Sequence, residues 1–431
     1  MKNLLTSLLI LFTYPLWAQS PTLKDSITAR LIDLGEVSVD NEDFQHFEGL
    51  KKTLKDVDIV MLGEQSHGEG TTYATKIKLV KYLHEEMGFD ILAFESGFFD
   101  CAKAWSLIEQ GEDVSLSLGK GVFNVWSTTK EFRPLARYIE TQAKGTRPLM
   151  LRGFDGQVAL KMSSEYLATD LRNFLQQMDH PMKDAEGLDH FARTVEMITS
   201  LEFKKYKKEN AIRDTAFLQQ LLNSLQVHQQ DSLTSFWIQC LKGAKGYLSD
   251  IKLKTDHRDR QMADNLSWLV EHHPGQKIIC WGATSHFLYN GHEVRMKLIP
   301  QLLAANYYKK QPMMGHYVKE KYGQRVYTIG FVAYQGVYGY TYRRKIKPPK
   351  EDTLEYLLGQ TSMDNAFLPL TDLKISPLRS RPLGNMYMKN DITRVMDGVI
   401  FNRKMVPLRM DSNLFLKIYP ENKYIKPEVT E

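Results

Sequence analysis

Two short apolar runs that each end in reactive side chains decide the fold of this chain. The first is DIVMLGEQSHG at residues 58–68, and the second is FDILAFESG at residues 89–97. An apolar run of about five residues that stops at glycine and polar residues is typical of a buried β-strand. Between the runs, residues 75–87 carry apolar side chains at helical spacing, and Gly88 is suited to end a helix. The order strand, helix, strand predicts an open α/β sheet.

Further apolar runs extend this sheet on both sides of the first unit. Strands are predicted at residues 148–151, 277–281, 326–334 and 398–401. Helical patterns separate several of these runs, which favours an α/β fold with a mostly parallel central sheet flanked by helices. Residues from about 160 to 273 differ, because leucines and aromatic residues recur there at spacings of three and four among many charges. We interpret this stretch as a long helical insertion in a single α/β domain at residues 19–431.

The first eighteen residues have the pattern of a secretory signal peptide. Lys2 is followed by an apolar core at residues 4–12 and by the small residue Ala18, so we expect cleavage that leaves Gln19 at or near the new N-terminus. The apolar core is much shorter than the roughly 20 residues that span a bilayer. No cysteine follows the predicted cut, so we expect no stable membrane anchor. The protein is therefore predicted to be periplasmic or secreted.

Charge and cysteine content narrow the classes of partner. Without Lys2, 55 Lys and Arg residues stand against 51 Asp and Glu residues, which leaves a net charge of about +4. This balance does not indicate binding to nucleic acid or to a membrane surface. The three cysteines cannot form a full disulfide framework and lack the spacing of a zinc site, although one bridge between Cys101 and Cys240 is possible. The sequence leaves the oligomeric state open.

The reactive residues of the first unit favour a catalytic site. In an open α/β sheet, ligands bind outside the carboxyl ends of the strands, which is where Glu64, His67 and Glu95 are expected. A loop histidine beside a carboxylate is suited to take a proton from water near neutral pH, so His67 is the candidate general base. Its alternative role is to cap the following helix. Glu95 ends a buried strand, and a charge there is costly unless it is paired or functional.

Several motifs together resemble the erythromycin esterase family. The segment GEQSHG at residues 63–68, the pair Gly88-Phe89 and the pair Phe94-Glu95 are similar to the family motif Gly-Glu-x-Thr-His-Gly and the strand that follows it. The likeness continues in LRGFDGQ (151–157) and RDRQMADN (258–265), and it spans about residues 40–405. The resemblance implies an α/β hydrolase that cleaves a macrolide lactone and thereby gives antibiotic resistance. It also implies that the positions of Glu64, His67 and Glu95 carry catalysis.

The resemblance supplies further candidate residues, and the chain also departs from the family pattern. After the predicted strand 277–281, the family commonly reads Trp-Ala-His-x-Gly-His, whereas this chain reads WGATSH at residues 281–286. His286 is therefore a second acid/base or an oxyanion donor, while Ala283 replaces the first family histidine. This replacement predicts slow cleavage of macrolides. Further residues match family motifs as substrate-binding or supporting groups, although an Arg-Asp pair is as often a structural ion pair: Asp155, Arg258, Asp259 and Trp281.

These residues are consistent with three functions. One is preferred, and the other two remain as alternatives. The preferred one is hydrolysis of a small-molecule ester or lactone by water that His67 activates, with no cofactor. A nucleophile elbow Gly-x-Ser-x-Gly does not occur, so a serine hydrolase is not indicated. The first alternative is a metal-dependent hydrolase in which zinc or manganese binds two carboxylates and two histidines: Glu64, His67, Glu95 and His286. The second is a non-catalytic periplasmic protein that binds a polyketide or saccharide.

Overall fold

The structure is a computed structural model that describes residues 23–39, 43–200, 203–227, 231–294, 312–340, 342–373, 378–422 and 424–426. The predicted signal peptide at residues 1–18 lies outside these ranges. Within them, no helix has both the length and the apolar character needed to cross a membrane.

The central sheet has nine strands among the described residues, in the order β1-β8-β11-β6-β2-β5-β3-β4, with β7 paired to β6. Its strands are β1 (Ile32–Asp33), β2 (Ile59–Leu62), β3 (Phe89–Gly97), β4 (Met150–Asp155), β5 (Lys277–Trp281), β6 (Val326–Tyr338), β7 (Arg344–Ile346), β8 (Asn365–Pro369) and β11 (Gly398–Met405). The six strands β11, β6, β2, β5, β3 and β4 pair in parallel, whereas β1, β7 and β8 pair antiparallel. The predicted mostly parallel α/β sheet is confirmed. A separate hairpin joins β9 (Leu378–Leu383) and β10 (Met386–Asn390).

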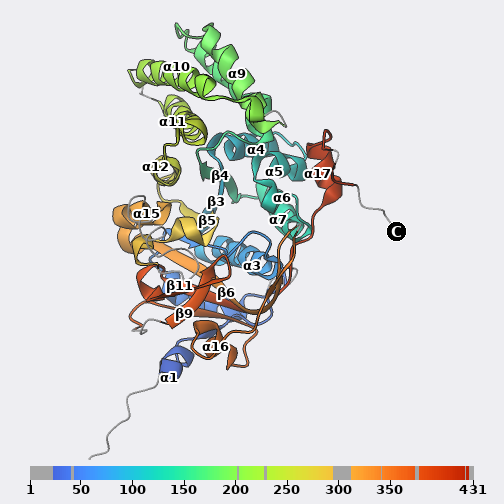
Figure 1. Ribbon diagram of the computed structural model, residues 1–431, viewed down its shortest axis with the longest axis vertical. Helices are drawn as coiled ribbons and strands as arrows, with labels where there is room; N and C mark the ends of the chain where they lie inside the picture. Colours follow the sequence, from blue (N-terminus) through green and yellow to red (C-terminus); the bar gives the residue numbers. More distant parts are fainter. Residues whose placement is uncertain are drawn as a thin grey trace, which may run out of the picture.

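Alternation along the strands divides the core into two layers. In β2, Val60 and Leu62 pack on one face of the sheet, where they meet α3 and α7. Met61 points to the other face, where α12 and α15 cover it. Since both faces of the parallel strands are covered, their side chains are nearly all apolar and buried, as is usual for a three-layer α/β fold. Helix α3 packs against β3 and β11, and Figure 1 shows it lying on the sheet.

Helices fill the connections between the strands. Those outside the β4–β5 connection are α1 (Leu23–Thr28), α2 (Glu48–Leu54), α3 (Gly70–Met87), α4 (Phe98–Glu109), α5 (Val114–Gly121), α6 (Asn124–Ser127), α7 (Arg133–Ala143), α13 (Thr284–Phe287), α15 (Met314–Tyr322), α16 (Leu354–Gly359) and α17 (Ser412–Ile418). Short 3-10 turns occur at η1 (Gln45–Phe47), η2 (Lys130–Phe132), η4 (Phe203–Lys205), η5 (Gly291–Glu293), η6 (Gly323–Arg325) and η7 (Ile392–Arg394).

The predicted helical insertion lies between β4 and β5. It begins with a π-helical turn at Ser163–Leu167 and continues through α8 (Ala168–Gln177), α9 (Glu186–Thr199), α10 (Lys208–Gln226), α11 (Ser232–Leu253) and α12 (Arg258–His272). In Figure 1, α9 and α10 form the end of the molecule farthest from the sheet, and α11 and α12 lead back toward it. The structure thus confirms the helical insertion that the sequence predicted. Its last helix, α12, begins with Arg258 at the carboxyl ends of the strands.

The bounds of several predicted elements needed correction, and one cysteine pairing is not formed. Helix α3 begins at Gly70 rather than at residue 75, and Gly88 ends it in the left-handed conformation at φ 73°. Strand β3 continues through Glu95 to Gly97 instead of ending at residue 95. The strand predicted at residues 148–151 starts at Met150 and runs to Asp155. Cys101, Cys240 and Cys280 are all free and buried, so the possible bridge between the first two is absent.

Candidate active site

The predicted site residues gather at the carboxyl ends of four neighbouring strands. Strands β2, β5, β3 and β4 are adjacent and parallel, so their ends form one continuous edge of the sheet. Glu64 follows β2, Glu95 lies near the carboxyl end of β3, Asp155 is the last residue of β4, and His286 follows β5 in α13. The N-terminus of α12 adds Arg258 to the same edge. Residues that are up to 222 positions apart in sequence therefore share one site, as this fold class predicts.

His67 is held by Glu64 and is open to solvent. The Nδ1–H of His67 donates to Glu64 Oε1 at 2.7 Å, which leaves its Nε2 as the exposed ring nitrogen. The side chain of His67 is 47% exposed, whereas that of Glu64 is fully buried. Burial alone would lower the pKa of His67, but the hydrogen bond and charge of Glu64 raise it above its ordinary value. The arrangement orients a base toward solvent.

A buried lysine, which the sequence did not single out, completes the surroundings of Glu64. Lys76 of α3 donates from Nζ to Glu64 Oε2 at 2.8 Å, and both side chains are fully buried. The indole N–H of Trp126 donates to Glu64 Oε1 at 2.9 Å. Burial would raise the pKa of Glu64, but the charge of Lys76 and the bond from His67 hold it below its ordinary value. Glu64 is therefore ionised and has both oxygens occupied.

A second cluster lies around Glu95. Arg258 donates from Nη2 to Glu95 Oε1 at 2.9 Å and to Asp155 Oδ2 at 2.7 Å. Burial would lower the pKa of Arg258, but the charges of Asp155 and Glu95 raise it. Arg258 and Asp259 were predicted as substrate-binding or supporting groups or as structural ion-pair residues, and the guanidinium of Arg258 bridges the ends of β3 and β4. Adjacent residues on a helix point about 100° apart, so two such residues usually have different partners.

His286 lies between two carboxylates. Its Nδ1 is 2.8 Å from Asp259 Oδ1, and its Nε2 is 3.3 Å from Glu95 Oε1. Asp259 also accepts from the backbone N–H of Met314 at 2.9 Å, which fixes its position. Burial would lower the pKa of His286, but the charge of Glu95 and the hydrogen bond to Asp259 raise it. His286 is therefore biased toward the imidazolium form, in which both nitrogens donate.

The loop after β5 joins the two clusters. Lys76 Nζ donates to Gly282 O at 3.2 Å, and the backbone N–H of Ala283 donates to Glu95 Oε2 at 2.8 Å. Glu64 O accepts from the backbone N–H of Thr284 at 3.0 Å. Ala283 thus stands at the boundary between the cluster of His67 and the cluster of His286.

Two predicted residues have different partners from those expected. Glu95 was predicted to flank His67 together with Glu64; it hydrogen-bonds to Arg258 and Ala283 and faces His286, while its charge also helps to raise the pKa of His67. Trp281 was predicted as a substrate-binding or supporting residue, yet its side chain is fully buried beneath the site. The ammonium of Lys76 lies 4.6 Å from the centre of the Trp281 ring, so this ring packs against the buried lysine.

The carboxylates and histidines do not form a metal centre within the described residues. There, no group of three or more His, Cys, Asp or Glu side chains has an arrangement that could hold a metal ion. The two carboxylates considered for that role instead direct their oxygens to protein donors. Glu64 accepts from Lys76 and Trp126, and Glu95 accepts from Arg258 and a backbone N–H.

Comparison with known proteins gives relatives that span most of the chain. The chain is 29% identical over 395 residues to "Putative hydrolase YbfO" of Bacillus subtilis (strain 168), a match that covers 83% of this chain and 86% of that protein. It is 19% identical over 406 residues to "Erythromycin esterase type II" of Escherichia coli, which covers 83% of this chain and 92% of that protein.

Solved structures share the fold. The crystal structure of a succinoglycan biosynthesis protein matches with a TM-score of 0.72 at 19% identity and covers 90% of this chain and 97% of that one. A mutant of the erythromycin esterase EreC in its open conformation matches with a TM-score of 0.67 at 15% identity, covering 87% and 98% of the two chains. The sequence profile described as "Erythromycin esterase" matches residues 84–405, which include Glu95, Asp155, Arg258 and His286. The chain therefore belongs to the erythromycin esterase family, a membership that supports assignment as a hydrolase.

Proposed function

We propose that this protein hydrolyses a carboxylic ester or lactone of a small molecule by means of water that His67 activates. The observation that carries the proposal is the pair of His67 and Glu64, in which a buried, ionised carboxylate holds one ring nitrogen at 2.7 Å and the other nitrogen is open to solvent. This is the arrangement that a general base requires, because the carboxylate fixes the tautomer and stabilises the imidazolium that forms.

The second cluster supplies the groups that an ester hydrolysis needs on the opposite side of the carbonyl. In the proposed reaction, Nε2 of His67 takes a proton as water attacks the carbonyl carbon. The oxyanion that forms is stabilised by the Nη1 hydrogens of Arg258, which is charged at all working pH values. When the carbon–oxygen bond breaks, the imidazolium of His286 gives its proton to the departing alkoxide. The products are an acid and an alcohol, and their summed mass exceeds that of the substrate by one water.

We further propose that this chemistry runs without a bound metal ion. A metal ion would compete with Lys76 and Trp126 for Glu64 and with Arg258 for Glu95, and all of these contacts lie between 2.8 and 2.9 Å. Lysine and arginine already provide the positive charge at each carboxylate. Metal analysis of the purified protein, and activity after treatment with a chelator, measure this directly. Loss of turnover on chelation that zinc or manganese restores would favour the metal-dependent alternative.

The substrate class follows from family relatives and from one local difference. The names of two relatives refer to erythromycin, which makes a macrolide lactone one candidate substrate. Ala283 takes the place of the first family histidine and lies between the two clusters, so the chain lacks one side chain that could contact a substrate there. We expect slower turnover of macrolides than of some other ester or lactone. We also propose that the protein acts in the periplasm or outside the cell.

The test is turnover of a panel of carboxylic esters and lactones, with macrolides of two ring sizes included and product masses recorded. His67→Ala should lower turnover by about 100-fold or more, because a general base typically contributes about 100- to 10,000-fold. Ser66→Ala is the matched control, because Ser66 is the neighbouring residue and, in the part of the chain that the structure describes, its hydroxyl hydrogen-bonds only to His67 O. Near-normal turnover by His67→Ala would disprove the mechanism. Failure to hydrolyse any member of the panel would favour the non-catalytic binding protein.

A further inference from the structure

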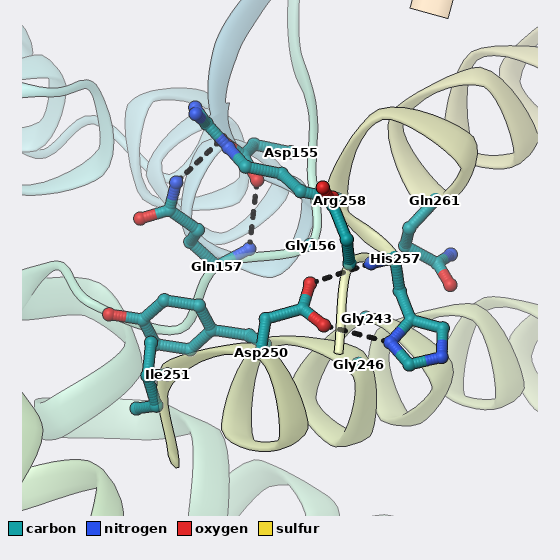
Figure 2. A pocket seen from close by; sticks show the side chains of 12 residues that line it. Asp155, Gly156, Gln157, Gly243, Gly246, Asp250, Ile251, His257, Arg258 and Gln261 are labelled. Atoms are coloured by element: carbon teal, nitrogen blue, oxygen red, sulfur yellow. Dashed lines mark hydrogen bonds and ion pairs between the residues drawn. The ribbon is translucent and has the colours of Figure 1, made fainter. Parts of the chain in front are cut away.

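A cavity adjoins the second cluster, and the proposed mechanism does not use it. The cavity has a volume of about 410 Å³ and lies between α11, the loop after β4 and the start of α12. This volume is within the range of small-molecule sites. Asp155 and Arg258 line it as well as the candidate active site, so one guanidinium borders both spaces. Figure 2 shows Arg258 and Asp155 on one side of the cavity and the residues of α11 on the other.

The wall formed by α11 is a stripe of one helix face. Gly243, Gly246, Tyr247 and Asp250 recur at spacings of three and four and all line the cavity. Gly243 has a packing reason, because a Cβ there would lie 2.9 Å from the Cα of Gly156. Close packing does not require glycine at position 246, since a Cβ there would meet only the Cβ of His257 at 3.5 Å. Glycine weakens a helix interior, so its presence at 246 is explained by the open space it leaves.

The opposite end of the cavity is rigidly built. Asp250 accepts from Thr255 Oγ1 at 2.6 Å, from the backbone N–H of His257 at 2.9 Å and from His257 Nδ1 at 2.8 Å. Figure 2 shows the two bonds between Asp250 and His257. These bonds fix the turn between α11 and α12, so the cavity has its shape before any ligand binds.

The polar groups of the lining define what the cavity can hold. Within the described residues, the side-chain carbonyl oxygens of Gln157 and Gln261, the carboxylate of Asp256 and the hydroxyl of Tyr247 make no hydrogen bond with the protein. Three carboxylates against one arginine disfavour an anionic ligand. These groups have no donor in the described part of the protein and are free to accept hydrogen bonds from a ligand. A ligand rich in hydroxyl groups would supply such bonds, whereas an apolar ligand would displace water from these groups and give no hydrogen bond in return.

An apolar face completes the lining. Tyr247 and Ile251, which belong to the same helix α11 as Gly243 and Gly246, add an aromatic ring and an aliphatic side chain to the lining. A ligand that fits must therefore present C–H groups on one face and hydroxyl groups on its edge. A saturated sugar ring has both. We propose that this cavity binds a saccharide ring carried by the substrate and so sets specificity beside the hydrolytic site, an inference that rests on the proposed function for its role but not for the binding itself.

Binding can be tested without turnover. Saturation-transfer NMR with methyl β-glucopyranoside, methyl α-mannopyranoside and methyl β-glucosaminide, with tetrahydropyran and tetramethylammonium as comparison ligands, should give saturation for at least one glycoside. Gly246→Leu fills the cavity and should weaken that binding by about tenfold or more. Lys242→Leu places the same side chain on an exposed position of α11 outside the lining and should leave binding unchanged. Gly246→Ala should still bind the glycoside, because the new Cβ meets only the Cβ of His257 at 3.5 Å. Its Tm should be equal to or higher than that of the parent protein.

Each result decides the proposal independently of catalysis. Binding of no glycoside, equal binding of tetrahydropyran, or binding that Gly246→Leu does not change would overturn it. Binding of tetramethylammonium alone would replace the saccharide with a cation. If an ester with a sugar substituent is turned over, Gly246→Leu should raise its KM and leave kcat for a small, unglycosylated ester unchanged. Saccharide binding with no turnover of any ester would support the saccharide site and contradict the proposed hydrolysis. Turnover with no saccharide binding would support the hydrolysis and contradict the saccharide site.

Discussion

Lys76 shows how a single residue can decide the state of a site and still be missed in the sequence. A lysine in a helix is nearly always solvent-exposed, so the sequence gives no reason to place this one in the core. In the structure it is fully buried and opposes Glu64, which in turn orients His67. Only the fold reveals the pairing, because Lys76 reaches back along α3 toward the loop that precedes it. Glu64 and His67, by contrast, could be predicted from their place directly after a strand.

The pair of Lys76 and Glu64 should be sensitive to loss of one partner. Lys76→Met leaves a buried carboxylate without its counter-charge and should lower the free energy of unfolding by about 3–5 kcal/mol. The double variant Lys76→Met with Glu64→Gln removes both charges and should regain most of that loss, although it should not regain activity. Urea unfolding of the three proteins measures both effects. If the double variant is no more stable than the single one, the buried ion pair is not what stabilises this region.

The two histidines predict the pH dependence of turnover. His67 must be neutral to accept a proton, and its pKa is raised, so turnover should fall as the pH drops through a value above the ordinary 6.5 of histidine. His286 must be protonated, and its pKa is also raised, so turnover should fall again at higher pH. Asp259→Asn keeps the shape but removes a charge beside His286, which should move the alkaline limb to lower pH. The acidic limb of the profile of kcat/KM against pH should not shift in this variant. If only the acidic limb shifts, His286 is the general base and His67 the general acid.

At the scale of elements, the parallel part of the sheet could be predicted and the antiparallel part could not. Strands β2, β3, β5, β6 and β11 are continuous apolar runs because both faces are buried. Strand β9 contains two arginines and a proline, so it lacks that pattern. Its hairpin with β10 nevertheless reaches the site, since Asn385 at the tip donates to Glu69 Oε1 at 2.8 Å and accepts from Gln65 Nε2 at 2.9 Å. Contacts over more than 300 residues leave no local sequence signal.

Two glycines of α11 give a matched prediction for this element. Gly246→Ala should raise the free energy of unfolding by about 0.5–1 kcal/mol, because alanine is the better helix former and its Cβ meets only ordinary contacts. Gly243→Ala should lower it, because the new Cβ would lie 2.9 Å from the backbone of Gly156 and one element must shift. Thermal or urea unfolding compares the two variants. Equal and positive changes would show that α11 and the loop after β4 are not in close contact.

At the scale of the whole molecule, three buried carboxyl groups on different elements have raised pKa values. Burial raises the pKa of Glu69 to about 8, that of Asp100 to about 7 and that of Glu355 to about 7. Asp100 accepts two hydrogen bonds from Ser163, and Glu355 has one oxygen without a partner among the described residues. In the folded protein these groups hold a proton that the unfolded chain has already lost at neutral pH.

Two histidines determine the pH above which these carboxyl groups dominate the pH dependence of the free energy of unfolding. Burial lowers the pKa of His84 and that of His273 to about 4, so both are neutral in the folded protein and charged in the unfolded chain below about pH 6.5. Their contribution to stability therefore rises with pH from about 4 to 6.5 and opposes that of the carboxyl groups. Above pH 6.5 this opposition ends, and the raised pKa values of His67 and His286 act in the same direction as the carboxyl groups.

We therefore expect the free energy of unfolding to fall between pH 6.5 and pH 8, by about 2–3 kcal/mol, since each proton held only by the folded state costs about 1.4 kcal/mol per pH unit. Glu69 should contribute most, because its pKa lies highest. Glu69→Gln imitates the protonated group and should flatten the dependence, whereas Glu86→Gln on the exposed surface should not. Urea unfolding at several pH values measures this. Stability that stays constant or rises over this range would mean that Glu69 is ionised in the folded protein and that a partner neutralises its charge.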